Sequence, residues 1–312
     1  MGAVRARRHL ISVDDLPDED LDALVRRGAE FAAGGAERDR PLREHVVGIL
    51  FRRTSTRTRT AFSAGALRLG AQVISYGPDD LQENTGESVE DTARVLSGML
   101  DVLVARTAAS EAELRVFASQ QRMSVVNAMS EAEHPTQALA DLTTLLGHFG
   151  RIEGLRVLYV GEGNNTASAL SLALSRFPDT ELHLRTPEGY GLHPRYLEQA
   201  ALSAKDRGGH VEQRHDMTAL PSVDVIYTTR WQTTGTTKAD PDWRTAFAPF
   251  QADEALLATS PEAVFLHDLP AHRGEEVTAA VLDGPRSLAF EQAQNKYHSA
   301  RAVLEWCTGG PR

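Results

Sequence analysis

Short apolar runs that alternate with segments of helical periodicity restrict the fold of this chain more than any other feature. Apolar runs of strand length occupy residues 46–51, 70–75, 102–105 and 124–127, and again 155–160, 181–184, 224–228 and 263–267. Helix-like segments follow most of them, as at residues 61–69, 87–99, 109–120 and 166–175. This alternation predicts an α/β fold with parallel sheets flanked by helices.

The same pattern predicts two domains. A long helix expected over residues 135–149 ends the first series of strands, and a second series begins after residue 150. A chain of 312 residues is long enough for two domains of ordinary size. We expect a first domain over residues 1–147 and a second over 148–286, each with a central parallel sheet. A closing helix within 287–312 is expected to pack back on the first domain.

The composition excludes several classes of protein. With 41% hydrophobic and 24% charged residues, the chain resembles a soluble globular protein, and its net charge of −10 argues against nucleic acid as the main partner. No apolar run reaches the roughly 20 residues of a membrane span, and the first ten residues lack the apolar core of a secretory signal. The single cysteine, Cys307, excludes an intramolecular disulfide and favours a reducing, cytoplasmic location.

A basic, hydroxyl-rich stretch follows the first strand. It reads Ser55-Thr56-Arg57-Thr58-Arg59 and precedes a helical segment. A helix N-terminus offers backbone N–H groups and the positive end of the helix dipole, and Arg, Ser and Thr side chains add bonds suited to phosphate. A solvated basic loop is the alternative, but the position between a buried strand and a helix favours a site for a small anion.

Three further motifs belong to the same pattern. Arg106 follows a strand, and His134-Pro135-Thr136-Gln137 places an imidazole and an amide where a helix begins. A lone histidine in such a place is usually structural. The turn at residues 161–165, Gly-Glu-Gly-Asn-Asn, has only part of the glycine pattern of a dinucleotide site, so nucleotide binding is not predicted.

Taken in order, these motifs resemble the aspartate/ornithine carbamoyltransferase family. The resemblance continues through residues 91–96, 161–165, 267–274 and 290–298, and so covers nearly the whole chain. It implies a two-domain enzyme of the EC 2.1.3 type, which transfers the carbamoyl group of carbamoyl phosphate to an amine and releases phosphate. It implies no cofactor, no metal and no covalent intermediate. The family's enzymes are trimers, so a homotrimer with sites at subunit interfaces is expected, with neither nucleic acid nor membrane as a partner.

The resemblance also assigns the donor site. The carbamoyl group would be held by Arg106, His134 and Gln137, and the catalytic groups on this side would be Arg57, Arg106 and His134. Gln82 aligns with the residue that the ornithine branch receives from a neighbouring subunit, although the lysine that often follows in this loop is absent. Lys296 replaces an arginine of the family's last motif. The full carbamoyl-phosphate set is Ser55, Thr56, Arg57, Thr58, Gln82, Arg106, His134, Gln137 and Lys296.

The acceptor side departs from the family. Thr229 stands where ornithine enzymes have an aspartate for the substrate amine, and Thr233-Thr234 replaces their Ser-Met. Arg230 and Gln232 resemble the aspartate branch, where this pair receives a substrate carboxylate. The full acceptor set expected from the resemblance is Asn164, Asn165, Thr229, Arg230, Gln232, Thr233, Thr234, Asp268 and Leu269; its two asparagines resemble the ornithine branch.

Asp268 is the third departure. Ornithine enzymes have cysteine here and aspartate enzymes proline. A carboxylate at this position could anchor a cationic group of the acceptor or take a proton from the attacking amine, which would make it catalytic. The alternative is that Asp268 only pairs with Lys296.

These departures predict a carbamoyltransferase whose acceptor is a small amino-acid-like amine other than plain ornithine or aspartate. Such an enzyme would serve a specialised, secondary-metabolite pathway. One alternative is a divergent ornithine carbamoyltransferase of arginine biosynthesis. Another is a catalytically silent homologue with a binding or regulatory role, which the intact phosphate-binding residues disfavour.

Overall fold

A computed structural model describes residues 7–35, 40–233 and 236–309 of the chain. The chain divides into two compact units: unit 1 contains Met1–Thr143 and Asn295–Arg312, and unit 2 contains Thr144–Gln294. It passes from one unit to the other within two long helices, α5 (Pro135–Phe149) and α11 (Ala289–Cys307). The predicted class, α/β with a parallel sheet in each half, is confirmed.

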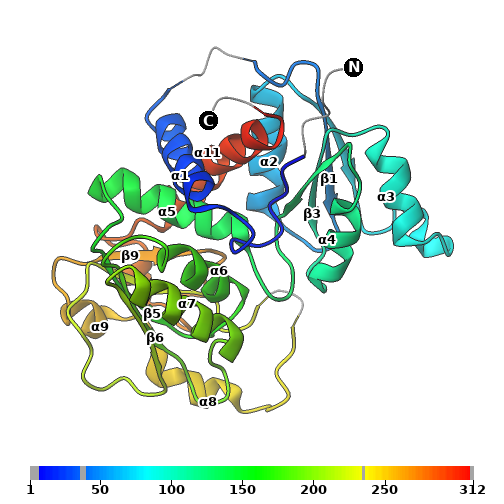
Figure 1. Cartoon of the computed structure of the whole chain (residues 1–312). Coiled ribbons are helices and arrows are strands. Elements are labelled where there is room, and N and C mark those ends of the chain that lie inside the picture. The colour runs from blue at the N-terminus through cyan, green and yellow to red at the C-terminus, as the bar shows by residue number, and fades with distance from the viewer. Residues whose placement is uncertain (1–6, 36–39, 234–235, 310–312) are drawn as a thin grey trace. The chain divides into compact units, whose positions relative to one another are not determined.

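Unit 1 is built on a parallel sheet of four strands in the order β2-β1-β3-β4. Helix α2 covers one face, and α3 and α4 cover the other (Figure 1). Its elements are α1 (Asp18–Ala32), β1 (Val46–Phe51), α2 (Thr56–Arg68), β2 (Gln72–Tyr76), the 3₁₀ turn η1 (Gln82–Thr85), α3 (Val89–Ser97), β3 (Val102–Arg106), α4 (Glu111–Ala118), β4 (Ser124–Asn127) and the first part of α5.

Burial explains why β3 and β4 of unit 1 are visible in the sequence. β3 and β4 are buried along their whole length, whereas the edge strand β2 is half exposed. In α1, Leu21, Leu24 and Val25 are buried. α1 begins after Pro17 without a side-chain capping bond, and the hydroxyl of the preceding Ser12 donates to Glu133.

Unit 2 is built on a parallel sheet of five strands in the order β7-β6-β5-β8-β9. Helices α6 and α7 follow the strands β5 and β6, and the shorter helices lie in the β8–β9 connection and after β9. Its elements are β5 (Arg156–Val160), α6 (Asn165–Leu174), β6 (Glu181–Arg185), α7 (Pro194–Asp206), β7 (His210–Arg214), β8 (Val225–Thr228), α8 (Trp243–Phe247), η2 (Ala248–Phe250), α9 (Glu254–Ala258), β9 (Val264–His267) and α10 (Ala279–Leu282).

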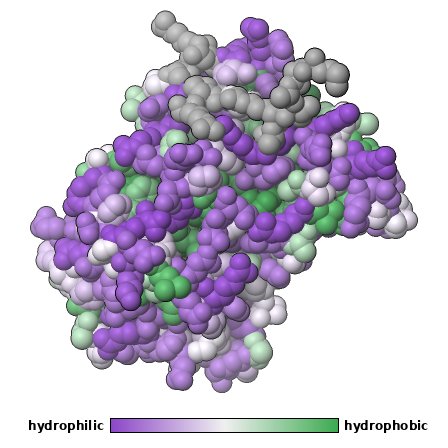
Figure 2. All heavy atoms as spheres, in the orientation of Figure 1, coloured by the Kyte–Doolittle hydropathy of each residue, from purple (hydrophilic) through white to green (hydrophobic). Residues whose placement is uncertain are grey.

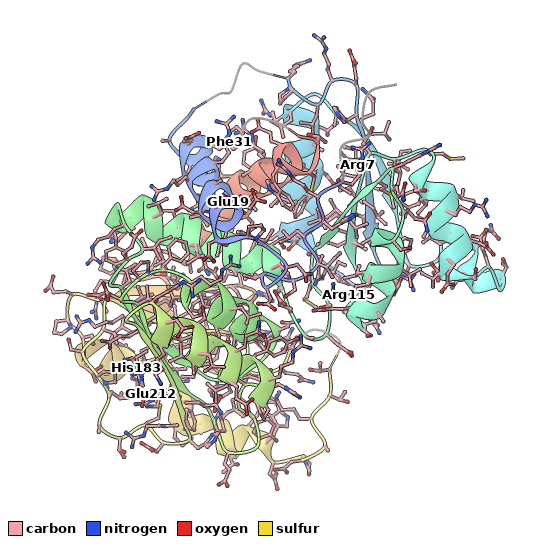
Figure 3. All side chains as sticks on the ribbon, viewed as in Figure 1. Arg7, Glu19, Phe31, Arg115, His183 and Glu212 are labelled. Carbon is pink, nitrogen blue, oxygen red and sulfur yellow. The ribbon has the colours of Figure 1, made fainter. Side chains whose placement is uncertain are left out.

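A polar cluster ties β6 to β7 at the edge of this sheet. Arg185 is 1% exposed, and both of its terminal nitrogens donate to Glu212 Oε1 at 3.0 Å. His183 Nδ1 also contacts Glu212 Oε1, at 2.9 Å, and Figure 3 shows these two side chains side by side. Partial burial raises the pKa of Glu212, but the hydrogen bonds from His183 and Arg185 lower it by more, so the net pKa is lowered. The carboxylate therefore stays charged against a buried guanidinium.

Hydrophilic side chains cover most of the face of the chain seen in Figure 2. None of the described helices combines the length and the apolar character needed to cross a membrane. Cys307, the last residue of α11, is 3% exposed, and burial raises the pKa of its thiol to about 12.

Candidate active site

The predicted phosphate-binding residues lie where the strand order of unit 1 changes direction. From β1 the chain goes first to β2 on one side and then to β3 on the other. In open α/β sheets, ligands bind outside the carboxyl ends of strands at such a switch point. β1 leads into Ser55–Arg59, and Arg106 ends β3 in register with Phe51, so these residues follow two neighbouring strands.

The phosphate-binding stretch forms the first turn of α2. The sequence suggested a helix from residue 61, but it begins at Thr56, so the hydroxyls and guanidinium of residues 56–59 lie on the helix itself. Ser55 is the extended N-cap residue, and among the described residues its side chain makes no capping bond. The first turn contains no acidic residue. An anion at this terminus would meet backbone N–H groups and the positive end of the dipole.

Arg52 has a structural role beside this turn. Its guanidinium forms ion pairs of 2.6 Å with Glu83, in the loop that carries Gln82, and with Glu113 on α4. Burial raises the pKa of Glu113, and the charge of Arg52 opposes that rise. Gln82 itself is exposed, and its side-chain oxygen accepts from Thr85 at 2.8 Å. The loop is therefore tied to the end of β1.

His134 and Arg106 are both buried, at 4% and 8% exposure. Burial, together with the charges of Lys296 and Arg106, holds the pKa of His134 well below its ordinary value. The imidazole is therefore neutral near pH 7. Its Nδ1 lies 3.2 Å from the hydroxyl of Thr136, and if that hydroxyl donates, Nε2 carries the proton and can act as a donor.

Gln137 is part of a buried polar chain within unit 1. Lys296 on α11 donates to Gln137 Oε1, and Gln137 Nε2 donates to Asp141 Oδ1 at 2.7 Å. All three side chains are at most 7% exposed. The amide group of Gln137 is thereby held in one orientation, with a cation on its oxygen and an anion on its nitrogen. Gln137 is therefore one partner of Lys296.

The acceptor residues of unit 2 also lie at a switch point, where the strand order changes direction at β5. The turn after β5 leaves no room for a side chain at Gly163, because a Cβ there would lie 2.1 Å from the backbone nitrogen of Leu192. Asn164 caps α6 by accepting from the N–H groups of Thr166 and Ala167 at 3.0 and 3.2 Å. Its Nδ2 donates to Thr229 and Thr233 at 3.4 and 3.1 Å.

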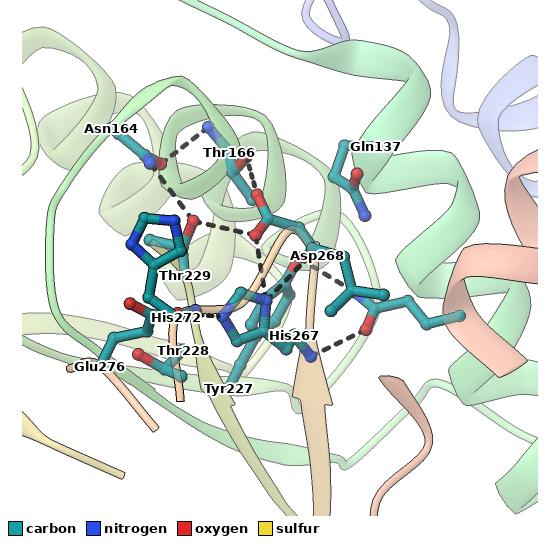
Figure 4. A network of polar contacts seen from close by, with 12 residues as sticks. Gln137, Asn164, Thr166, Tyr227, Thr228, Thr229, His267, Asp268, His272 and Glu276 are labelled. Carbon is teal, nitrogen blue, oxygen red and sulfur yellow. Dashed lines mark hydrogen bonds and ion pairs between the residues drawn. The ribbon is translucent and has the colours of Figure 1, made fainter. Parts of the chain in front are cut away.

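Asp268 lies at the centre of a hydroxyl cluster (Figure 4). Thr229 Oγ1 donates to Asp268 Oδ1 at 3.0 Å, and Thr166 Oγ1 donates to Asp268 Oδ2 at 2.9 Å. The two departures from the ornithine branch, Thr229 and Asp268, are therefore in direct contact. The next residue, Leu269, has a φ of +51°, a strained conformation for a branched side chain that is common at functional sites.

A buried lysine anchors the loop after β8. Lys238 donates to Glu162, and its Nζ lies 4.7, 5.3 and 4.9 Å from the ring centres of Tyr190, Trp243 and Phe247. Glu162 also accepts from Thr233 at 3.1 Å, and Thr233 in turn accepts from Asn164. One hydrogen-bonded series thus connects this aromatic cage to Asn164, Thr229 and Asp268.

The remaining acceptor candidates lie outside this series. Arg230 is half-buried, and its buried Nε has no hydrogen-bond partner among the described residues. Gln232 donates to the backbone oxygen of Thr236 at 2.8 Å and so closes its own loop. Asn165 is the first residue of α6 and is 5% exposed. Thr234 lies outside the described residues.

One group of described side chains has the spacing of a metal site. His272, Glu275 and Glu276 offer ligand atoms within 4.8 Å of one another. However, Glu276 is fully buried and Oε1 already accepts from the backbone of His272 and contacts His267 Nε2 at 3.2 Å. The contacts of Glu276 are those of a carboxylate that orients His267. The prediction that the enzyme needs no metal stays a prediction.

Several residues of these networks were not singled out by the sequence. Thr166, Glu162 and Asp141 are ordinary in type and become notable only through their partners. Lys238 is likewise recognised only through its partners, Glu162 and the surrounding aromatic rings.

Comparisons with known proteins agree with this arrangement. Residues 8–146 match the family model "Aspartate/ornithine carbamoyltransferase, carbamoyl-P binding domain", and residues 153–307 match "Aspartate/ornithine carbamoyltransferase, Asp/Orn binding domain". The chain is 38% identical to an ornithine carbamoyltransferase of Gloeobacter violaceus (99% of this chain, 98% of the relative) and 36% identical to one of Thermococcus kodakarensis (98% of each).

Solved structures give the same result. The structure of ornithine carbamoyltransferase from Pyrococcus furiosus matches with a TM-score of 0.89 and 34% identity, and covers 98% of this chain and 99% of that one. The family predicted from the motifs is confirmed. With its fold, its two matched domains and its full-length relatives, the chain belongs to the aspartate/ornithine carbamoyltransferase family and is a carbamoyltransferase.

Proposed function

We propose that this enzyme transfers the carbamoyl group of carbamoyl phosphate to the side-chain amine of ornithine, as in arginine biosynthesis. The observation that carries this proposal is the near full-length match, at 36–38% identity, to several ornithine carbamoyltransferases. These relatives favour ornithine over the specialised acceptor expected from the sequence. We therefore propose ornithine as the acceptor and arginine biosynthesis as the pathway. The motifs alone had left both as the alternative.

The donor residues suit carbamoyl phosphate. The first turn of α2 combines Ser55, Thr56, Arg57 and Thr58 at a helix N-terminus, which are the groups that a phosphate needs. Arg106, His134 and Gln137 would contact the carbamoyl group. Lys296 would act through Gln137, whose amide it orients.

The chemistry follows from these assignments. The neutral acceptor amine attacks the carbonyl carbon, the C–N bond forms, and negative charge develops on the carbonyl oxygen. The C–O bond to phosphate then breaks, and the phosphate leaves with the electron pair and takes up the proton that the amine nitrogen loses. Donors placed at the developing charge stabilise the transition state more than the ground state. Arg106 and neutral His134 would donate to the oxyanion, and Arg57 would stabilise the leaving phosphate.

One observation keeps a second candidate acceptor open, a cationic amino acid other than ornithine. Thr229 cannot supply the negative charge that the ornithine branch has at its position, whereas Asp268, in contact with it, can. This rearrangement is compatible with ornithine, but also with another cationic amino acid of a specialised pathway.

An acceptor panel tests the function. Phosphate release from carbamoyl phosphate is measured with ornithine, lysine, 2,4-diaminobutyrate, putrescine and aspartate, and ornithine is expected to give the highest kcat/KM. Release no faster than the blank with every acceptor would refute the proposal. A clearly better acceptor than ornithine would favour the second candidate.

Arg57→Ala tests the donor site. Because the variant removes the cation at the leaving phosphate, turnover with every acceptor is expected to fall by at least about 10²-fold. Arg53→Ala, which removes an exposed arginine from the preceding loop, is the matched control and should retain turnover. Activity of Arg57→Ala equal to that of the control would remove Arg57 from the site.

We further propose that the enzyme is a cytoplasmic homotrimer in which Gln82 reaches a neighbouring site. The exposure of Gln82 and the exposed apolar side chains Leu67, Ile74 and Met99 of unit 1 support an interface. Light scattering should give the mass of three chains. Mixed trimers of Arg57→Ala and Gln82→Ala chains should regain activity if the site is shared, and no recovery would contradict the proposed contribution of Gln82.

A further inference from the structure

We propose that Glu133 is a positioning residue for His134, and that it acts by fixing the loop before α5 to the N-terminal segment 10–13. This inference rests on the proposed function, in which neutral His134 donates to the oxyanion. Glu133 was not among the residues predicted for the site, and it touches no reacting group itself.

The N-terminal segment lies against β4, the edge strand that leads into this loop. Leu10 is fully buried and forms an isolated parallel bridge with Val126. Its N–H donates to the carbonyl of Val125 at 2.9 Å, and its carbonyl accepts from the N–H of Asn127 at 2.7 Å. The segment therefore continues the sheet of unit 1 beyond β4, next to the loop that carries His134.

Two buried polar side chains shape the loop itself. Asn127 Nδ2 donates to the carbonyl of Ile11 at 2.8 Å, and Asn127 Oδ1 accepts from the N–H of Met129 at 3.0 Å. Met129 has a φ of +142°, so these bonds hold a backbone conformation that is unfavourable for a residue with a side chain. The hydroxyl of Ser130 accepts from the N–H of Glu133 and donates to its carbonyl, both at 3.1 Å.

The side chain of Glu133 completes the connection to the N-terminal segment. Oε1 bonds to the N–H of Val13 and Oε2 to the hydroxyl of Ser12, both at 2.6 Å. All three residues are at most 6% exposed. A carboxyl group held through both oxygens has one favourable orientation. Burial raises the pKa of Glu133 to about 8, so near pH 7 this connection places no full negative charge beside the oxyanion donor.

His134 follows Glu133 directly and is held on its other side by α5. Its carbonyl accepts from the N–H of Gln137 at 2.9 Å, and its Nδ1 lies 3.2 Å from the hydroxyl of Thr136. The place of the imidazole thus depends on α5 after it and on the Glu133 connection before it. A shift of about 1 Å in a reacting geometry can cost about 10²-fold in rate. Because an oxyanion donor matters most when charge has developed, loss of the connection should lower kcat more than it raises KM.

The first experiment measures kcat and KM with carbamoyl phosphate and the best acceptor of the panel. Glu133→Ala removes both bonds, and kcat should fall by about 10- to 100-fold while the KM for carbamoyl phosphate stays within about threefold. Glu133→Gln keeps groups that can bond to Ser12 and Val13, and should keep kcat within about threefold of the wild type. Glu131→Ala, at an exposed position two residues earlier, is the control and should keep the wild-type kcat.

The second experiment separates positioning from a general loss of structure. His134→Ala should itself lower kcat by about 10²- to 10³-fold. If Glu133 acts through His134, adding Glu133→Ala to this background should lower kcat by less than about a further twofold. Ser12→Ala removes one of the two bonds and should lower kcat by about 3- to 10-fold. It gives the same cycle with His134→Ala if Glu133→Ala does not fold.

The possible outcomes separate this inference from the proposed function. The inference is overturned if Glu133→Ala or Ser12→Ala has the kcat of the Glu131→Ala control, or if Glu133→Gln loses as much as Glu133→Ala. It is also overturned if either effect multiplies with that of His134→Ala. Each of these results leaves carbamoyl transfer in place. Absence of phosphate release by the wild type with every acceptor would instead refute the proposed function.

Discussion

Replacing Glu133 with glutamine should change how the stability of unit 1 depends on pH. The carboxyl group is fully buried next to His134, where the hydroxyl of Ser12 donates to Oε2 and the N–H of Val13 donates to Oε1, both at 2.6 Å. Burial raises the pKa of Glu133 from 4.5 to about 8, although both hydrogen bonds oppose this rise. The native chain therefore keeps a proton that the unfolded chain releases.

The sign of the effect follows from proton uptake. Between pH 4.5 and about 8 the folded state binds one more proton than the unfolded state at Glu133, so its contribution to the free energy of unfolding decreases as pH rises. At about 1.4 kcal/mol per pH unit, the loss across this window is at most about 4–5 kcal/mol. Below pH 4.5 the contribution is complete.

Glutamine has the shape of the protonated acid but does not titrate. Its oxygen can accept from Val13 and its amide can donate to the hydroxyl of Ser12, so Glu133→Gln should match the wild type within about 1 kcal/mol at pH 5. At pH 8 the variant should be more stable by about 2–4 kcal/mol, because the wild type then carries the cost of its titrating carboxyl group.

Urea unfolding at pH 5, 6.5 and 8 measures this difference. Fluorescence of Trp306, the only tryptophan of unit 1, reports on the unit that contains Glu133, in a background in which the two other tryptophans are replaced by phenylalanine. Glu131→Gln makes the same change at an exposed position and should follow the wild type at every pH. If Glu133→Gln also follows the wild type, the buried carboxyl group is not protonated and the reasoning fails.

Three other predictions concern the networks. Lys238→Met removes the ion pair with Glu162, and initial rates should show a KM for the acceptor raised at least about tenfold and a KM for carbamoyl phosphate within about twofold of the wild type. Lys205→Met, at an exposed position, is the control. An unchanged acceptor KM in Lys238→Met would contradict the anchoring role. His134 should remain neutral at pH 6.5 because its pKa is lowered by burial; ¹⁵N shifts of the imidazole measure this, and a titration midpoint near 6.5 would refute it. Glu212→Gln should lower the free energy of unfolding by about 1–3 kcal/mol, because it leaves the buried guanidinium of Arg185 without its anion. Chemical denaturation measures this, and an unchanged free energy of unfolding would show that the pair does not stabilise the fold.

The fold could be predicted wherever strands are buried on both faces. β3, β4 and β8 are buried along their length, and the bounds expected from the sequence agree within one or two residues. β7 was missed because it is an edge strand in which only Val211 is buried, so it lacks the hydrophobic signal. α7 was missed for a similar reason, since its buried residues, Ala200 and Ala204, are small.

The site could be predicted only as far as its residue types allowed. The hydroxyls and guanidinium groups of Ser55–Arg59 suit phosphate in any arrangement, so a phosphate site could be predicted there from the residue types alone. The contact between Thr229 and Asp268 could not be foreseen, because it depends on the register of two strands almost 40 residues apart in sequence. The cage around Lys238 joins Tyr190 of the β6–α7 loop to Trp243 and Phe247 of α8 and has no local signature either.

The burial of Cys307 determines how the chain responds to oxidants and alkylating reagents. Reactivity of a thiol requires both access and ionisation, and this one is 3% exposed with a pKa of about 12. It is also the only cysteine in the sequence. The native fold therefore presents no reactive sulfhydryl group, and iodoacetamide or maleimide should leave it unmodified. A cysteine introduced at any exposed position would then be the single attachment point for a spectroscopic label.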